Sequence, residues 1–201
     1  MYGDKMKSLK QIAVLICLIQ LGQAQVLNRG SCNKNIPTVQ NFDATRYLGR
    51  WYEQEKYPFI FELGGKCIYA EYGQLKNGDL SVYNYNINEL TGRPNDILGS
   101  AKLVDSGKLK VRFNNMPAFI GSADYWVLDT DYDNYATVYS CTPLSSESHA
   151  TIVWILTRDQ IPSATVIDKA ASALVKNNIS LLPLKITNQI SCGDVKEQKD
   201  M

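Results

Sequence analysis

Apolar and polar positions alternate with a period of two through the middle of the chain. In residues 108–113, KLKVRF, the side chains of Leu109, Val111 and Phe113 share one face and the basic side chains share the other. One buried face and one wet face are typical of a strand in an antiparallel sheet. Similar short runs occur at residues 49–57, 67–75, 79–88, 96–104, 108–114, 123–130, 135–142 and 151–158. The chain is therefore predicted to be all-β.

The runs are separated by Gly, Asn and Asp, with no long helical period between them. Residues 76–79, KNGD, and 105–108, DSGK, predict tight hairpin turns, because Asn and Gly tolerate positive φ. Successive strands of this kind form an antiparallel sandwich or a barrel. Eight strands favour a closed barrel whose interior can hold one ligand.

The last predicted strand differs from the others. Residues 151–158, TIVWILTR, are apolar on both faces, so the outer face must be covered as well. A helical period follows directly, with Pro162 near its first turn. The apolar positions of that period are Val166, Ile167, Ala170 and Leu174. We expect this helix to end at residues 177–178 and to pack outside the barrel against Val153 and Ile155.

The first residues of the chain carry a separate pattern. Three lysines precede an apolar run at residues 12–19, and the small residues Gly22 and Ala24 follow it. This is the pattern of a secretory signal peptide, with cleavage expected after Ala24. A membrane anchor is the alternative, but so short a run spans too little of a bilayer to anchor stably. We expect residues 1–24 to be removed and residues 25–201 to form a single secreted, extracellular domain.

The composition is that of an ordinary globular domain. Of the 201 residues, 45% are hydrophobic and 20% are charged, which excludes a disordered or fibrous chain. Removal of residues 1–24 lowers the number of basic residues from 21 to 18 and of acidic residues from 20 to 19. No cluster of Lys or Arg remains that could contact a series of phosphates. We therefore expect no nucleic-acid partner.

Secretion implies two covalent features. The mature chain keeps four cysteines: Cys32, Cys67, Cys141 and Cys192. An even number in an oxidising compartment predicts two disulfides, for which three pairings are possible. Asn178-Ile179-Ser180 is the only N-glycosylation sequon, and the sequence leaves open whether Asn178 is glycosylated.

Metal and catalytic centres have few candidate residues. No Cys-x-x-Cys pair is present and His149 is the single histidine, so we expect no metal site. A Ser-His-Asp or Cys-His arrangement would have to use His149, which lies in a polar loop. We expect no catalytic residues.

Three short motifs occur in order along the predicted strands. Gly49-Arg50-Trp51 opens the first strand, Thr130-Asp131-Tyr132 lies in the turn between the sixth and seventh, and Arg158 ends the eighth. Together they resemble the three sequence signatures of the lipocalin family. The resemblance implies an eight-stranded antiparallel up-and-down β-barrel with one C-terminal α-helix packed outside.

Longer phrases narrow the resemblance within the family. Residues 47–53, YLGRWYE, and 125–128, YWVL, resemble the apolipoprotein D-like lipocalins. Residues 56–58, KYP, and 65–67, GKC, resemble the bilin-binding lipocalins of insects. The similarity covers nearly all of residues 31–193.

The family fold implies a structural role for the three motifs, because they meet at the closed end of the barrel. The residues concerned are Gly49, Trp51, Thr130, Asp131, Tyr132 and Arg158. The guanidinium of Arg158 should lie over the ring of Trp51, a cation-π contact worth about 1 to 2 kcal/mol. Direct contact between Trp51 and a ligand is the alternative.

The resemblance also selects one pairing of the cysteines. The implied disulfides are Cys32–Cys141 and Cys67–Cys192. Each bridge is expected to stabilise the fold by about 4 to 5 kcal/mol in the chain-entropy model. A bridge from the second strand to a tail outside the barrel needs an outward-facing Cys67, which turns Ile68, Ala70 and Tyr72 inward.

Resemblance and alternation together predict the lining of a ligand cavity. The predicted lining residues are Tyr72, Asn84, Phe113, Met116, Trp154, Ile68 and Val111. Aromatic walls with one amide and a tyrosine hydroxyl suit an elongated apolar molecule that has one polar end. The resemblance implies a fatty acid, a sterol or other isoprenoid, or biliverdin as ligand, with no cofactor required. The alternative is a core that the aromatic rings fill.

Two apolar stretches fall in loops that the fold would bring to the open end of the barrel. They are residues 58–61, PFIF, and 115–120, NMPAFI. Exposed apolar clusters usually mark an interaction surface. We expect Phe59, Ile60, Phe61 and Phe119 to form a lid that also contacts a lipid membrane or lipoprotein surface. An inward-folded plug is the alternative.

These features predict a secreted carrier that binds and transports a small hydrophobic ligand by excluding water. One alternative is an enzyme of the lipocalin isomerase or reductase type, which needs a reactive cysteine. Disulfides account for every mature cysteine, so we expect no enzyme. The other alternative is a receptor-signalling lipocalin or one that scavenges oxidised lipid through Met116.

Overall fold

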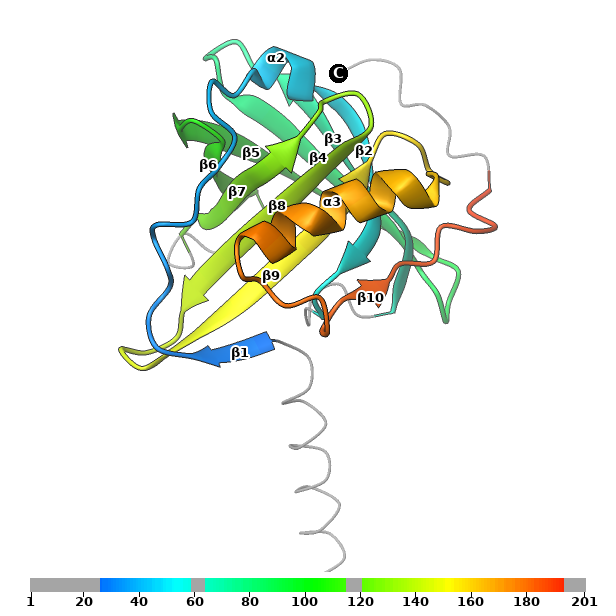
Figure 1. Ribbon diagram of the computed structural model, residues 1–201. Coiled ribbons are helices and arrows are strands. Elements are labelled where there is room, and N and C mark those ends of the chain that lie inside the picture. The colour runs from blue at the N-terminus through cyan, green and yellow to red at the C-terminus, as the bar shows by residue number, and fades with distance from the viewer. Residues whose placement is uncertain (1–25, 59–63, 115–120, 194–201) are drawn as a thin grey trace, which may run out of the picture.

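The computed structural model describes residues 26–58, 64–114 and 121–193. Eight antiparallel strands follow one another around a closed barrel (Figure 1). They are β2 (Gly49–Lys56), β3 (Gly65–Gln74), β4 (Leu80–Asn88), β5 (Pro94–Asp105), β6 (Lys108–Phe113), β7 (Ala123–Thr130), β8 (Tyr135–Pro143) and β9 (Ser148–Thr157). The barrel closes where β9 pairs with β2, with Tyr52 opposite Thr157. The predicted all-β, eight-stranded barrel is confirmed.

Both predicted tight turns are present. Gly78 and Gly107 have φ angles of 89° and 67°, in the left-handed region that glycine favours. At Gly107 space also excludes a side chain, because a Cβ atom there would lie 2.9 Å from the Cβ of Thr38. The N-terminal segment can therefore pass closely under the β5–β6 turn.

Three short elements, β1 (Val26–Arg29), β10 (Lys185–Ile186) and α2 (Ala44–Tyr47), were not predicted. β1 pairs with β9, and β10 pairs with β2. β1 and β10 are too short for their sequences to show an alternating pattern that predicts a strand. The one-turn helix α2 lies at one end of the barrel and is capped by the side chain of Asp43. The predicted helix is α3 (Ala164–Lys176), which has Pro162 just before its N-cap Ser163 and ends at its C-cap Asn177, in agreement with the prediction.

The helix α3 lies across the outside of β7, β8 and β9 (Figure 1). Val153 and Ile155 of β9 are fully buried and share an outer apolar cluster with Ala170 and Leu174 of α3. Leu156, on the opposite face of the same strand, belongs to the cluster inside the barrel. The strand is apolar on both faces because both are covered, as predicted. Among the described residues, no helix has the length and apolar character needed to cross a membrane.

Two disulfides tie the chain ends to the barrel wall. Cys32–Cys141 joins the N-terminal segment to β8, and Cys67–Cys192 joins the C-terminal segment to β3, in the pairing that the resemblance implies. The strand at Cys67 is less regular than expected. β3 shifts its register against β4 between Lys66 and Tyr69, and Cys67 has a φ of 54°. A bulge, and not simple alternation, therefore directs Cys67 toward the C-terminal tail.

Candidate functional site

The barrel end that carries α2 is closed by polar groups whose partners are all protein atoms. Arg158 places its guanidinium carbon 3.7 Å from the centre of the Trp51 ring. Its nitrogens donate to the backbone oxygens of Tyr132, Arg50 and Arg46, each at 2.9 Å. Burial lowers the pKa of Arg158 from its ordinary value. The ring of Trp51 is fully buried and its Nε1 donates to the backbone oxygen of Tyr47. This geometry supports a structural role for Trp51.

The turn between β7 and β8 belongs to the same closed end. The carboxylate of Asp131 accepts the backbone N–H groups of Asp133, Asn134 and Tyr135. Burial opposes ionisation of Asp131, but these hydrogen bonds and that of the Asn134 side chain outweigh it and lower the pKa of the carboxyl. The turn is thereby fixed by its own side chains, with Tyr132 at a φ of 68°.

A layer of aromatic side chains covers the closed end from inside the barrel. The hydroxyl of Tyr72 donates to that of Tyr125 at 2.8 Å, and the hydroxyls of Tyr125 and Tyr47 are 2.9 Å apart. The ring of Trp154 lies next to Tyr125, with centroids 6.2 Å apart. Burial raises the pKa of all three tyrosines, so their hydroxyls stay protonated. Three hydroxyl hydrogens serve two hydrogen bonds, which leaves one hydrogen free to be donated.

The predicted inner position of Asn84 follows from the register of β4. Leu80 and Val82 belong to the interior cluster, and Asn84 continues the same alternation. It is opposite Ala70, which packs against that cluster. The Oδ1 atom of Asn84 is buried and has no hydrogen-bond partner among the described residues. A buried acceptor in this state can accept a hydrogen bond from a bound ligand or from a water molecule inside the barrel.

An ion pair faces the interior above the aromatic layer. Glu53 is opposite Leu156 and Lys56 is opposite Trp154, both of which point inward. The Nζ of Lys56 lies 2.9 Å from the Oε1 of Glu53, and the two side chains are 11% and 3% exposed. Residues three apart in a regular strand point to opposite faces. A bulge between Glu53 and Glu55 turns both inward, so alternation alone could not have found this pair.

The comparisons with known proteins agree with this geometry. A family model described as "Lipocalin-like domain" matches residues 42–189. The chain is a lipocalin. It is 39% identical to apolipoprotein D of Oryctolagus cuniculus over 186 residues, which covers 91% of this chain and 95% of that protein. It is 28% identical to the bilin-binding protein of Pieris brassicae over 190 residues, or 93% of this chain and 96% of that one.

The solved structures support the fold of this lipocalin. Insecticyanin from the tobacco hornworm Manduca sexta superposes with a TM-score of 0.71 at 24% identity, covering 82% of this chain and 89% of that one. At this level of identity, the likeness concerns the fold alone. The family predicted from the three sequence motifs is confirmed.

The lining residues predicted for this lipocalin fall into three groups. Tyr72, Val111 and Trp154 belong to or pack against the interior cluster, and Phe113 packs against it beside Gly99. Ile68 is buried but lies at the β3 bulge, outside the interior cluster. Other predicted site residues lie outside the described residues: Phe59, Ile60, Phe61, Met116 and Phe119. The sequence reading missed Tyr47, Tyr125, Glu53 and Lys56.

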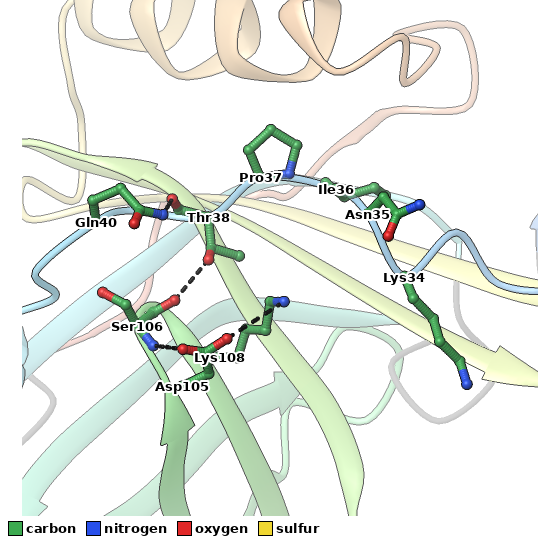
Figure 2. A pocket seen from close by; sticks show the side chains of 9 residues that line it. All are labelled: Lys34, Asn35, Ile36, Pro37, Thr38, Gln40, Asp105, Ser106 and Lys108. Carbon is green, nitrogen blue, oxygen red and sulfur yellow. Dashed lines mark hydrogen bonds and ion pairs between the residues drawn. The ribbon is translucent and has the colours of Figure 1, made fainter.

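A surface hollow of about 360 Å³ lies elsewhere, between the N-terminal segment and the β5–β6 turn (Figure 2). The hydroxyl of Thr38 donates to the backbone oxygen of Ser106 across it at 2.6 Å. Its polar wall and its position outside the barrel indicate packing of the N-terminal segment, not an apolar ligand site.

Metal ligands do not gather in the described parts of the chain, where no three His, Cys, Asp or Glu side chains form a group. The single histidine, His149, lies on the outer β8–β9 hairpin, where its Nδ1 is 2.8 Å from the backbone oxygen of Gly30.

Proposed function

We propose that this lipocalin carries one small hydrophobic molecule inside its barrel and binds it by excluding water, without a chemical step. The observation that carries the proposal is the amide oxygen of Asn84, buried without a partner among the described residues, on an inner wall that is mainly apolar and aromatic and has the Glu53–Lys56 ion pair as its charged part. Such a wall with few polar groups suits an elongated ligand with one polar end. A carrier role also fits the lipocalins to which the chain is similar, among them apolipoprotein D and the bilin-binding protein.

The ligand classes we propose are a long-chain fatty acid, a sterol or other isoprenoid, and biliverdin. The similarity to a protein named for binding a bilin supports the third class. Burial of eight to ten methylene groups contributes about 6 to 8 kcal/mol, before the cost of immobilising the ligand. We therefore expect affinities in the micromolar range. We propose that no cofactor is required and that the chain acts as a binding and transport protein, not as an enzyme.

We also propose that the chain is secreted after removal of residues 1–24 and that Asn178 is glycosylated. The two disulfides support an oxidising compartment. Asn178 is exposed just after α3, where a glycan would meet no obstacle. A shift in mass on treatment with an N-glycosidase would support occupancy, and an unchanged mass would contradict it.

The lid proposal concerns residues 58–61 and 115–120, which we expect at the open end. Phe59, Ile60, Phe61 and Phe119 would contact lipid membranes or lipoprotein surfaces in addition to covering the ligand. Flotation with phosphatidylcholine vesicles tests this. A Phe59→Ser, Phe61→Ser, Phe119→Ser variant should float less than the wild type, and equal flotation would contradict the lid proposal.

The carrier function is tested by native mass spectrometry and an absorption spectrum of the secreted protein, followed by titration with retinol, palmitate and biliverdin. We expect an added mass or a long-wavelength visible band, and saturable binding of at least one ligand. Trp154→Ala, inside the barrel, should weaken binding, whereas Trp126→Ala, on the outer side, should not. Absence of both bound mass and saturable binding would contradict the proposal.

A further inference from the structure

Pairing between neighbouring strands leaves part of the barrel wall open between β2 and β3. β2 and β3 pair directly only where Gly49–Tyr52 lie opposite Tyr69–Tyr72, near the closed end. Toward the open end both strands are irregular, since β2 bulges against β9 and β3 bulges against β4. We call this open part of the wall, between residues 53–56 and 66–68, the seam.

The C-terminal segment, residues 185–192, fills the seam. β10 pairs with β2 on one side, and the N–H of Thr187 donates to the backbone oxygen of Gln54 at 2.8 Å. On the other side, the N–H of Cys67 donates to the backbone oxygen of Asn188 at 2.8 Å. The segment therefore acts as a short additional strand that contacts both edges of the seam.

Gln189 joins the two edges with a single side chain. Its Nε2 donates to the backbone oxygen of Glu53 at 2.8 Å and to that of Ile68 at 2.7 Å. The two carbonyl acceptors fix the orientation of the amide, because only the nitrogen can donate to both. Gln189 is 5% exposed, and its Oε1 is buried without a partner among the described residues.

The segment also covers charge that faces the barrel interior. The hydroxyl of Thr187 donates to the Oε1 of Glu53 at 2.5 Å, and both residues are buried. If the segment left the seam, the carboxylate of Glu53 and the backbone oxygens of Glu53, Gln54 and Ile68 would lose these partners. Water would have to replace them in the wall of the ligand cavity.

The Cys67–Cys192 disulfide holds the segment in place. Cys192 follows Gln189 by three residues, so the bridge keeps the side chain of Gln189 close to both strands. Cys67 is 2% exposed, and its left-handed backbone belongs to the same β3 bulge whose N–H contacts Asn188. The β3 bulge, the Cys67–Cys192 disulfide and the C-terminal segment are therefore joined into one structural unit.

We propose that residues 185–192 form a wall element of the ligand cavity whose seating in the seam sets how fast ligand leaves, with Gln189 as its positioning residue and Cys67–Cys192 as its fixing bond. The inference rests on the proposed carrier function. A ligand inside a closed wall must leave through the open end, whereas an unfilled seam widens that exit and admits water beside the ligand.

The test compares matched disulfide variants. Cys67→Ser with Cys192→Ser frees the C-terminal segment, and Cys32→Ser with Cys141→Ser removes the other bridge, away from the seam. Gln189→Leu removes the amide and leaves both bridges intact, with Gln40→Leu at the N-terminal segment as its control. Hydrogen exchange by mass spectrometry reports the seam peptides, and stopped-flow fluorescence with phosphatidylcholine vesicles as acceptor reports the release of retinol.

In the Cys67/Cys192 variant we expect residues 53–56 and 66–68 to lose protection while residues 49–52 keep theirs. Release of retinol should be about tenfold faster in that variant and about threefold faster in Gln189→Leu, with both controls within about twofold of the wild type. Unchanged seam protection, equal loss throughout the barrel, or equal acceleration by the two disulfide variants would overturn the inference. If the wild type binds no retinol, the carrier proposal fails for this probe, while the exchange pattern still decides whether the segment is a separable wall element.

Discussion

The closed end of the barrel and the half that faces the open end differ in how many hydrogen-bond partners their buried polar groups have. At the closed end, the guanidinium of Arg158 and the carboxylate of Asp131 have several protein partners each. Farther in, Asn84 and Gln189 keep buried oxygens that have no partner among the described residues, and the strands β2 and β3 carry bulges. The first arrangement maximises stability. The second leaves hydrogen-bonding capacity for a ligand and places less regular structure around it.

The largest effect should come from the centre of the closed end. Trp51→Ala removes a fully buried ring and leaves a cavity, so we expect a loss of about 3 to 5 kcal/mol in the free energy of unfolding. Trp126→Ala, on the half-buried outer side, should cost clearly less. Urea denaturation followed by circular dichroism measures both. Equal losses would contradict the assignment of the closed end as the centre of stability.

Arg158→Met should have the next largest effect on stability. The change keeps a long apolar side chain but leaves three backbone oxygens without their charged donor, so we expect a loss of about 2 to 3 kcal/mol. Arg46→Met is the control, because its ion pair with Asp133 is exposed and should contribute less than about 1 kcal/mol. Ligand affinity should not change in either variant. A matched loss in the two variants would refute the role of Arg158.

The tyrosine layer between the two regions predicts a fall in stability at alkaline pH. Burial raises the pKa of Tyr47, Tyr72 and Tyr125, so the unfolded chain loses these protons first as the pH rises. Their contribution is complete below the ordinary pKa of about 10 and is lost at about 1.4 kcal/mol per pH unit for each tyrosine above it. Unfolding free energies at pH 9, 10 and 11 should show a smaller slope for Tyr125→Phe. Identical slopes would contradict this reading.

The smallest effect on stability, and a clear effect on binding, is expected at Asn84. Asn84→Leu removes a buried oxygen that has no partner in the described part of the chain, so the free energy of unfolding should change by less than about 0.5 kcal/mol. Retinol affinity should fall about tenfold, equivalent to about 1.4 kcal/mol. Isothermal titration measures this, with Asn28→Leu outside the barrel as control. Unchanged affinity would remove Asn84 from the site, and lower stability would indicate a structural role.

The sequence predicted more of the closed end than of the ligand side. Gly49, Trp51 and Arg158 belong to motifs that can be recognised in the chain itself, and the structure brings them together. Tyr125 also follows the alternation of its strand, but nothing in that pattern distinguishes a ligand contact from a core residue. Its hydrogen bonds to Tyr47 of α2 and Tyr72 of β3 depend on elements far apart in the chain.

The C-terminal tail was harder still to predict. Residues 185–189, KITNQ, have no strong apolar period, and the prediction for this region was limited to a tail outside the barrel that Cys192 joins to Cys67. The place of Gln189 depends on two bulges that separate β2 from β3, and bulges are fixed by pairing with other strands. The role of Gln189 cannot be predicted from the sequence, because the seam that its side chain fills exists only in the folded barrel.

The sequence by itself determined the eight strands, the helix with its covered face, and the family, because alternation, helical period and short motifs are local properties of the chain. Only the tertiary structure decided that Glu53 and Lys56 both face inward, that three tyrosine hydroxyls meet, and that the tail completes the wall. A one-residue bulge reverses which face a side chain takes, and its position is set by partners distant in sequence.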